Sequence, residues 1–223
     1  MSGGGASRAR VLARVRRALA DVPRHERPGD HPVPRGYEHV HGRRTPQESV
    51  ALLAAHLTEY RAVVHRTDEA GLPGLIAALL ERRGARRVVV PEGLPAAWPA
   101  QASAEKVPDT ADLTVRDLDA VDSVVTGCAL AVAETGTLVL DGGPGQGRRR
   151  ITLVPDHHIC VVRVPGQVVD SVPQALARLS PTRPLTWISG PSATSDIELD
   201  RVEGVHGPRA LDVVLAGDPA VGP

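Results

Sequence analysis

Aromatic residues are scarce in this chain of 223 residues: they make up only 2% of it, with no Phe, two Trp and two Tyr. Val, Leu, Ile and Ala must therefore fill the core. The aromatic platforms on which single-stranded nucleic acids stack are missing, so we expect no nucleic-acid partner. Long apolar runs are missing too. No uninterrupted apolar stretch approaches the ~18 residues of a membrane-spanning helix, which excludes such a span.

Cysteines are equally few. Cys128 and Cys160 are the only two, and neither has a neighbour at Cys-x-x-Cys spacing. A disulfide framework, a thiolate zinc site or an iron–sulfur cluster therefore cannot be built from this chain alone. We expect a reducing compartment, the cytoplasm, and no cofactor in this chain. Arginines interrupt each apolar stretch near the N-terminus, so a secretion signal is not expected.

The net charge is zero, but the charges are unevenly distributed. Residues 1–44 contain ten Arg against four carboxylates, a local charge of +6, so residues 45–223 carry −6. Helical spacing of apolar residues predicts a short amphipathic helix near the N-terminus, followed by an irregular linker up to residue 44. This basic helix either packs on its own domain or docks a partner. A membrane-surface role is least favoured, because the apolar face is narrow. The apolar positions are Val11, Leu12, Val15 and Leu19.

From residue 45 onward, helices and strands alternate. Thr45-Pro46-Gln47-Glu48 is a capping box with proline at the first helical position, which predicts a helix from that point. Strands separated by helices indicate an α/β fold with a mixed, largely parallel sheet flanked by helices over residues 45–217, before a short tail at 218–223. Further helices are expected at 69–83 and 172–179. Strands are expected at 62–65, 87–91, 123–126, 185–189 and 211–215.

Residues 128–164 follow a different pattern, in which strands succeed one another without helices. Gly- or Pro-containing turns separate these strands. We therefore expect a β-rich insert within the α/β domain, and the unusual loops of the sequence cluster there. The expected strands are 128–133, 137–140, 151–154 and 159–164.

A glycine-rich segment, Gly142 to Gly147, precedes three consecutive arginines. Glycines let backbone N–H groups approach an anion closely, and arginines add bidentate positive charge. The segment matches neither the Walker A motif nor the dinucleotide-binding spacing. A long hairpin turn with a solvated arginine cluster is the alternative interpretation. The candidate ligand-binding residues here are Gly143, Gly145, Gly147, Arg148 and Arg149.

Three further residues are candidates for proton chemistry: Glu134, Asp156 and His157. Glu134 ends an apolar run, where a buried carboxylate needs a partner or has a raised pKa; an ion pair with an arginine is the plainer interpretation. His157 and His158 are adjacent on an expected strand and face opposite sides, so we expect no metal site. One histidine oriented by Asp156 would serve as an acid or base, and a plain strand-end cluster is the alternative.

A fourth candidate segment begins at Gly190. Ser195 and Glu198 have capping-box spacing, which predicts a helix start. A helix N-terminus preceded by the hydroxyls of Ser192 and Thr194 would bind an anion, although a good helix start explains much of the pattern by itself. His206 follows in a loop flanked by glycines.

Together these segments resemble the lactate utilization protein C family, whose members are single LUD domains. The resemblance runs from about residue 46 to residue 217. It implies a fold similar to the sugar-phosphate isomerase and CoA-transferase superfamily, and a role beside two iron–sulfur partner subunits in oxidising L-lactate to pyruvate. The matching segments are 125–140, 143–147, 155–159, 190–198 and 204–208.

The resemblance and the motifs together predict a non-redox subunit of an L-lactate oxidation complex. It would bind a small carboxylate between the glycine-rich segment and the Ser192/Thr194 turn, with the iron–sulfur clusters in the partner subunits. One alternative is a free-standing acyl-transferase or isomerase-like enzyme using Glu134, because Glu134-Thr135-Gly136 is similar to the glutamate loop of CoA transferases, a fold-level analogy. The other alternative is an assembly subunit without a ligand.

Overall fold

The structure, a computed structural model, describes residues 3–21, 27–30, 33–34, 36–194, 202–203 and 207–217. The chain divides into two compact units, residues 1–37 and 38–223. The first unit contains helix α1 (Gly3–Ala18), over the segment predicted to be helical, and a short 3-10 helix, η1 (Pro28–Asp30). Residues 38–44, which the sequence pattern assigned to the linker, belong to the second unit.

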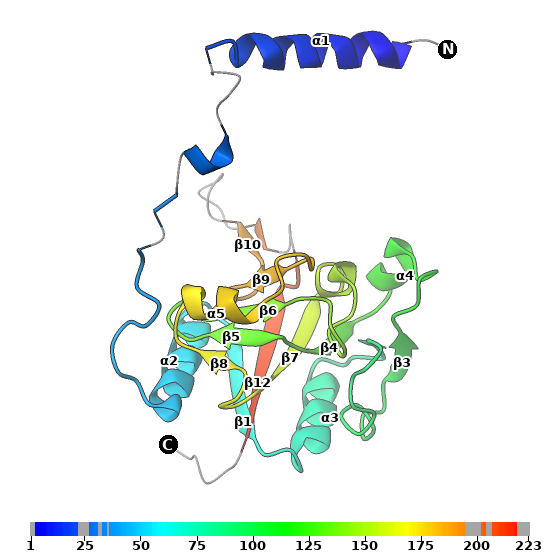
Figure 1. The fold of residues 1–223 in the computed structure, drawn as a ribbon. Helices are drawn as coiled ribbons and strands as arrows, with labels where there is room; N and C mark the ends of the chain where they lie inside the picture. The colour runs from blue at the N-terminus through cyan, green and yellow to red at the C-terminus, as the bar shows by residue number, and fades with distance from the viewer. Residues whose placement is uncertain are drawn as a thin grey trace. The chain divides into compact units, whose positions relative to one another are not determined.

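Six strands form the central sheet of the second unit, and all neighbouring pairs in it are parallel (Figure 1). The inner strands are buried almost throughout, as expected for a parallel sheet covered on both faces. The predicted α/β fold with a largely parallel sheet is therefore confirmed. In spatial order the strands are β1 (Val63–Thr67), β12 (Ala210–Ala216), β7 (His157–Arg163), β4 (Ser123–Gly127), β2 (Arg87–Val90) and β3 (Glu105–Pro108).

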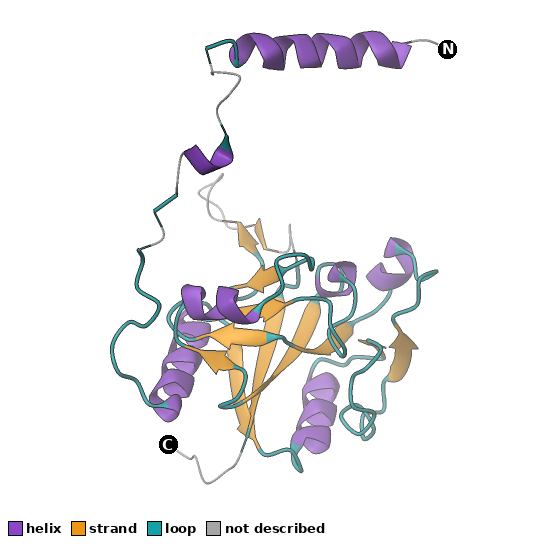
Figure 2. Cartoon of the chain, viewed as in Figure 1, coloured by secondary structure: helices purple, strands orange, loops and turns teal. Residues whose placement is uncertain are grey.

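Helices and a second, smaller sheet cover the central sheet (Figure 2). Helix α3 (Leu72–Arg82) packs on one face. Helix α2 (Pro46–Glu59) and the smaller sheet pack on the other face. Helix α5 (Val172–Arg178) covers the outer side of the smaller sheet, and the short helix α4 (Val115–Asp119) packs beside β2 and β3. The smaller sheet has the strand order β8 (Val168–Val169), β5 (Leu130–Val132), β6 (Thr137–Leu140) and β9 (Thr186–Ile188).

The start of α2 shows how the sequence directs this packing. The Thr45 hydroxyl accepts a hydrogen bond from the Glu48 N–H at 3.2 Å, and the Glu48 carboxylate accepts one from the Thr45 N–H at 2.7 Å. This is the predicted capping box, which satisfies two N–H groups that the helix itself leaves unpaired. The buried face of α2 then carries Val50, Leu53 and Leu57 against the central sheet.

Two expectations for the β-rich insert were wrong. The strand expected at 159–164 is β7, which lies in the middle of the central sheet and not in an insert. The strand expected at 151–154 is instead a 3-10 helix, η2 (Arg149–Thr152). Its single large apolar residue, Ile151, is fully buried against Val89 and Val124. One turn of helix is enough to bury that side chain, so the apolar run did not require a strand.

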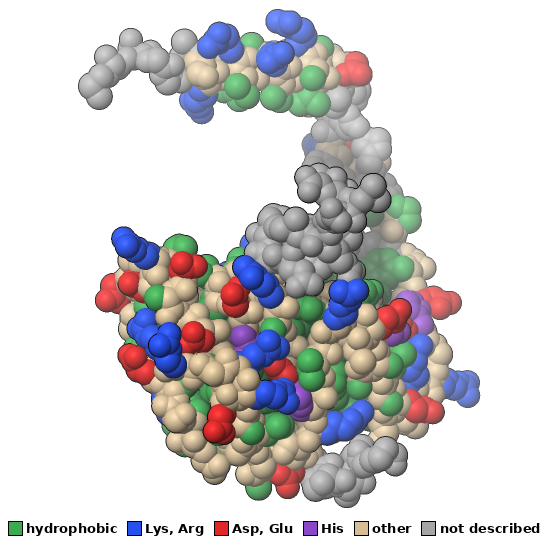
Figure 3. Space-filling view, turned by 180° about the vertical axis from the view of Figure 1, so that it is seen from behind, with side chains coloured by type: hydrophobic (Ala, Val, Ile, Leu, Met, Phe, Trp, Pro, Cys, Tyr) green, Lys and Arg blue, Asp and Glu red, His purple; other side chains and the backbone are tan. Residues whose placement is uncertain are grey.

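The surface carries charges of both signs. On the face of the second unit shown in Figure 3, the described Lys and Arg side chains are interspersed with Asp and Glu. None of the helices in the described part of the chain is both long and apolar enough to cross a membrane.

Candidate anion site

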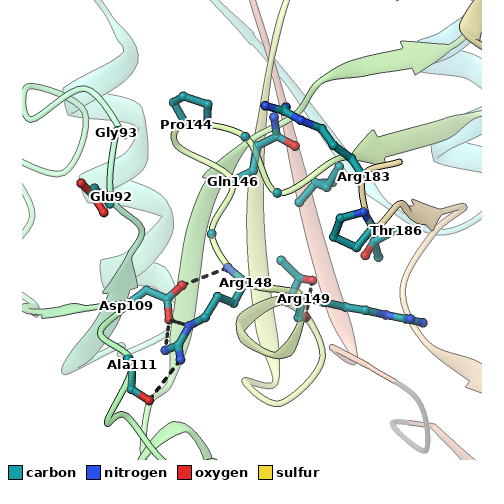
Figure 4. A pocket seen from close by; sticks show the side chains of 16 residues that line it. Glu92, Gly93, Asp109, Ala111, Pro144, Gln146, Arg148, Arg149, Arg183 and Thr186 are labelled. Atoms are coloured by element: carbon teal, nitrogen blue, oxygen red, sulfur yellow. Dashed lines mark hydrogen bonds and ion pairs between the residues drawn. The ribbon is translucent and has the colours of Figure 1, made fainter. Parts of the chain in front are cut away.

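A cavity of about 900 Å³ opens where β2 and β3 end (Figure 4). Glu92 and Gly93 follow β2, and Asp109 follows β3; the opposite wall comes from the glycine-rich loop, residues 141–149. Ligands of open parallel sheets bind outside the carboxyl ends of the strands, which is where this cavity lies. The remaining wall is formed by residues 183–186, just before and at the start of β9.

Backbone hydrogen bonds fix the glycine-rich loop to the ends of two strands. The Gly145 N–H donates to the Glu92 carbonyl, and the Gly127 N–H at the end of β4 donates to the Gly145 carbonyl, both at 2.8 Å. Gly145 has a φ of +73°. The neighbouring Gly93 has a φ of +80°, and a Cβ there would lie 2.8 Å from that of Pro144. Gly145 therefore allows the tight turn of the loop through its positive φ. Its N–H group already donates to a protein carbonyl and is not available to a ligand.

Gly147 is the most crowded glycine of this loop, which yields a testable prediction. Its φ is +69°, and a Cβ would lie 2.4 Å from Ile151 Cδ1 and 2.9 Å from Pro91 Cβ. Gly142 has a similar φ of +68°, but its nearest neighbour would be 3.9 Å away. We expect Gly147→Ala to lower the unfolding free energy by about 2–4 kcal/mol, through backbone strain plus overpacking. Gly142→Ala should cost only the strain, about 1 kcal/mol.

Urea unfolding of both variants measures this difference. Equal losses in the two variants would show that the crowding at Gly147 relaxes freely and that the loop is not held as described.

Arg148 forms hydrogen bonds with the residues that directly follow β3. The Asp109 side chain is only 3% exposed and accepts hydrogen bonds from the Arg148 N–H at 2.9 Å and from Arg148 Nε at 2.8 Å. The same guanidinium donates to the carbonyls of Thr110 and Ala111. Arg148 was expected to bind a ligand, but in the structure it holds the loop to the central sheet.

A second ion pair fixes the other end of the loop. Arg183 donates to Asp141 Oδ2 at 2.6 Å, while the Gly143 N–H and the Gln146 amide donate to Asp141 Oδ1 at 3.0 and 2.9 Å. Burial alone would raise the pKa of Asp141, but these donors outweigh it and hold the pKa below its ordinary value. The Gly143 N–H, like that of Gly145, is therefore already used within the protein.

Arg149 is the basic residue that these contacts leave available. Its side chain is exposed, and no residue in the described part of the chain forms a hydrogen bond or an ion pair with its guanidinium group. Figure 4 shows Arg148 and Arg149 extending in opposite directions, one toward Asp109 and the other away from it. Positive charge for a ligand is thus concentrated at Arg149.

A second cavity of about 490 Å³ adjoins the first and shares Arg149, Thr152 and Thr186 with it. It lies between η2, strand β9 and the central sheet, and Ser192 forms part of its wall. Arg149 and Ser192 therefore line the same cavity. Thr194 lies in a short strand, β10 (Ala193–Thr194), which pairs with β11 (Val202–Glu203). The helix expected from Ser195 and the residue His206 lie outside the described residues.

His158 forms the inner wall of the smaller cavity and is only 1% exposed. Its Nε2 lies 2.8 Å from the hydroxyl of Thr126 on the neighbouring strand β4. Burial, with a smaller effect from the nearby His157, lowers the pKa of His158 to about 3. The ring is therefore neutral at physiological pH.

His157 points to the opposite face of β7, away from both cavities. Its Nδ1 lies 2.8 Å from Ser123 Oγ, and its Nε2 lies 2.8 Å from Asp212 Oδ2. The expectation that Asp156 orients this histidine was wrong. Asp156 is exposed at the start of the strand, where it lies 3.5 Å from Arg209 Nε. The buried carboxylate of Asp212 holds the ring instead.

Comparison with known proteins shows which family this chain belongs to. The family model of the LUD domain matches residues 50–216. The chain belongs to the LUD domain family. Lactate utilization protein C of Deinococcus radiodurans is 48% identical to this LUD protein over 165 residues, which cover 72% of this chain and 76% of that protein. Lactate utilization protein C of Bacillus subtilis is 26% identical over 189 residues, covering 76% and 78%.

A solved structure shares the fold of this LUD protein. The crystal structure of a DUF162 family protein from Deinococcus radiodurans superimposes with a TM-score of 0.66 at 38% sequence identity. The alignment covers 78% of this chain and 100% of the other.

Glu134 lies outside both cavities of the LUD domain. Its carboxylate accepts a hydrogen bond from Arg44 at 2.8 Å and lies 2.8 Å from His41 Nδ1. Burial would raise the pKa of Glu134, but these two partners outweigh it and lower the pKa. This is the ion pair that the sequence offered as the plainer interpretation. It holds residues 41–44 to the end of β5.

Proposed function

We propose that this chain is the non-redox subunit of a system that oxidises L-lactate to pyruvate in the cytoplasm, and that it binds a small carboxylate at Arg149. Its similarity to lactate utilization protein C of two bacteria supports the link to lactate utilization. The observation that carries the binding proposal is the guanidinium of Arg149, which has no partner among the described residues and lies at the junction of two cavities, whereas Arg148 and Arg183 are already paired with carboxylates.

Lactate oxidation removes two electrons, which an iron–sulfur subunit can accept. Cys128 and Cys160 are buried in the core of this chain, and its described residues contain no cluster of His, Cys, Asp and Glu suited to hold a metal. The proposal places the clusters in two iron–sulfur partner subunits, as the resemblance to the lactate utilization protein C family implies. The role of this chain is to hold the carboxylate of the substrate by charge-assisted hydrogen bonds from Arg149.

The geometry favours this function over an acyl-transferase or isomerase that uses Glu134. A nucleophile or base must reach the reacting atoms of its substrate. The Glu134 carboxylate is instead bound by Arg44 and His41, outside both cavities.

Ligand-dependent stability tests the binding proposal. Saturating L-lactate or pyruvate should raise the thermal midpoint of the isolated chain, because a ligand at a hundred times its Kd stabilises the folded state by about 2.7 kcal/mol. Arg149→Ala should abolish this increase while leaving the midpoint without ligand almost unchanged. Arg66→Ala is the matched control, since Arg66 is an exposed arginine on the far edge strand β1.

A full ligand response in Arg149→Ala would show that the arginine is only solvated charge. No response in the unmodified chain would favour an assembly subunit without a ligand.

A further inference from the structure

The smaller cavity contains a buried polar group whose hydrogen-bonding capacity is only half used. His158 contacts Thr126 through Nε2, and no residue in the described part of the chain bonds to its other ring nitrogen, Nδ1. Nδ1 of His158 is not among the fully buried atoms that lack a partner, so it keeps some access to the cavity. Because His158 forms part of the cavity wall, its partner is expected to be a molecule that enters the cavity.

The contact with Thr126 indicates which nitrogen carries the proton. Thr126 is fully buried, and the contact with His158 is the sole hydrogen bond of its hydroxyl among described residues. If His158 donated from Nε2, the hydroxyl proton of Thr126 would be left without an acceptor, which costs about 1–3 kcal/mol. The hydroxyl therefore donates to Nε2, and the proton of the neutral ring lies on Nδ1. His158 thus presents an N–H donor to the cavity.

Four groups of the cavity wall are hydrogen-bond donors for which the described residues offer no acceptor: the guanidinium of Arg149, the Nδ1–H of His158, the hydroxyl of Thr186 and the indole N–H of Trp187. Among these, Arg149 carries the charge and His158 is the most deeply buried. Leu153, Trp187 and Leu211 supply apolar surface in the same cavity. This combination suits a small organic acid with a carboxylate, a second acceptor oxygen and a short alkyl group.

We infer that the smaller cavity binds a 2-oxo or 2-hydroxy carboxylate, whose carboxylate pairs with Arg149 and whose oxygen on C2 accepts a hydrogen bond from His158 Nδ1. This inference rests on the proposed function and adds to it the site and the residue that distinguishes these acids from simple carboxylates. Propionate has the same carboxylate and alkyl chain as pyruvate but no oxygen on C2, so it would leave the His158 donor unpaired. We expect propionate to bind about 10-fold more weakly than pyruvate.

Calorimetric titration with pyruvate and propionate tests this preference. Replacing His158 alone would leave Thr126 without an acceptor, so the suitable variant is the pair Thr126→Val and His158→Phe, which removes both hydrogen-bonding partners together. In the double variant the two acids should bind with equal affinity. Arg149→Ala should weaken both acids alike. Long-range ¹H–¹⁵N NMR spectra of the unmodified chain provide a second readout, which does not depend on a variant that folds.

In those spectra His158 should be protonated on Nδ1 at neutral pH, and pyruvate should shift the Nδ1 resonance. If pyruvate binds in an Arg149-dependent manner without affecting His158, and propionate binds equally well, the inference about His158 is overturned while the proposed function stands. If neither acid binds the unmodified chain, the ligand-binding part of the proposed function fails, and the inference fails with it.

Discussion

Asp212→Asn should lower the unfolding free energy by about 3–5 kcal/mol, which is the usual cost of breaking a buried ionic network by removing one partner. The Asp212 side chain is 0% exposed, and its carboxylate lies 2.8 Å from His157 Nε2 and 2.6 Å from His65 Nε2. Arg82 adds a hydrogen bond at 3.3 Å. An amide is neutral and can accept through only one of its two terminal atoms, so at least one buried partner would be left unsatisfied.

Equilibrium unfolding in urea measures this loss. Asp156→Asn is the matched control, because Asp156 is the exposed carboxylate one residue before His157 and should be replaceable without a measurable change. A loss below 1 kcal/mol in Asp212→Asn would contradict the view that this carboxylate anchors strands β1, β7 and β12 to one another.

Acid should destabilise the protein well above the pH at which carboxylates titrate. The pKa of His158 is about 3 in the folded chain, against an ordinary value of 6.5 for an unperturbed histidine. Between these values the unfolded chain binds a proton at this position and the folded chain does not, so stability is lost as the pH falls from 6.5 toward 3. The slope should approach about 1.4 kcal/mol per pH unit from this residue alone.

The double variant Thr126→Val, His158→Phe isolates this contribution. Urea unfolding between pH 7 and pH 4.5 should show a shallower loss of stability in the variant than in the unmodified chain. Asp212 acts in a lower window: its pKa is held below the ordinary value of 3.8 because hydrogen bonds from His157 and His65 outweigh the effect of burial. Its contribution is therefore lost only as the pH falls below about 4. Identical pH profiles for the two proteins would show that His158 is not buried as a neutral ring.

Local sequence signals predicted much of the fold. The capping box at Thr45 and the strands expected at 87–91, 123–126 and 211–215 correspond to elements with nearly the predicted bounds. Strand β3 was missed because Glu105 and Lys106 give it neither an apolar run nor a clear alternation. It forms because it pairs with β2, a long-range interaction that no local pattern records.

The candidate site was harder to predict, because equivalent residues in the sequence have different partners in space. Arg148 and Arg149 are adjacent and chemically identical, and the partner that separates them, Asp109, lies 39 residues earlier in the chain. Alternation along a strand correctly indicated that His157 and His158 face opposite sides. It did not indicate which of the two histidines lines the cavity, since that depends on Thr126 and Asp212 in neighbouring strands.

Reconstituted lactate oxidation tests the proposed subunit role. The isolated chain should show no turnover of L-lactate with an artificial electron acceptor, and addition of the two iron–sulfur partner subunits should produce it. Arg149→Ala should still co-purify with the partners but lose most of this activity, while Arg66→Ala should retain it. Sustained lactate oxidation by the chain alone, or full activity of the partners without it, would contradict the proposal.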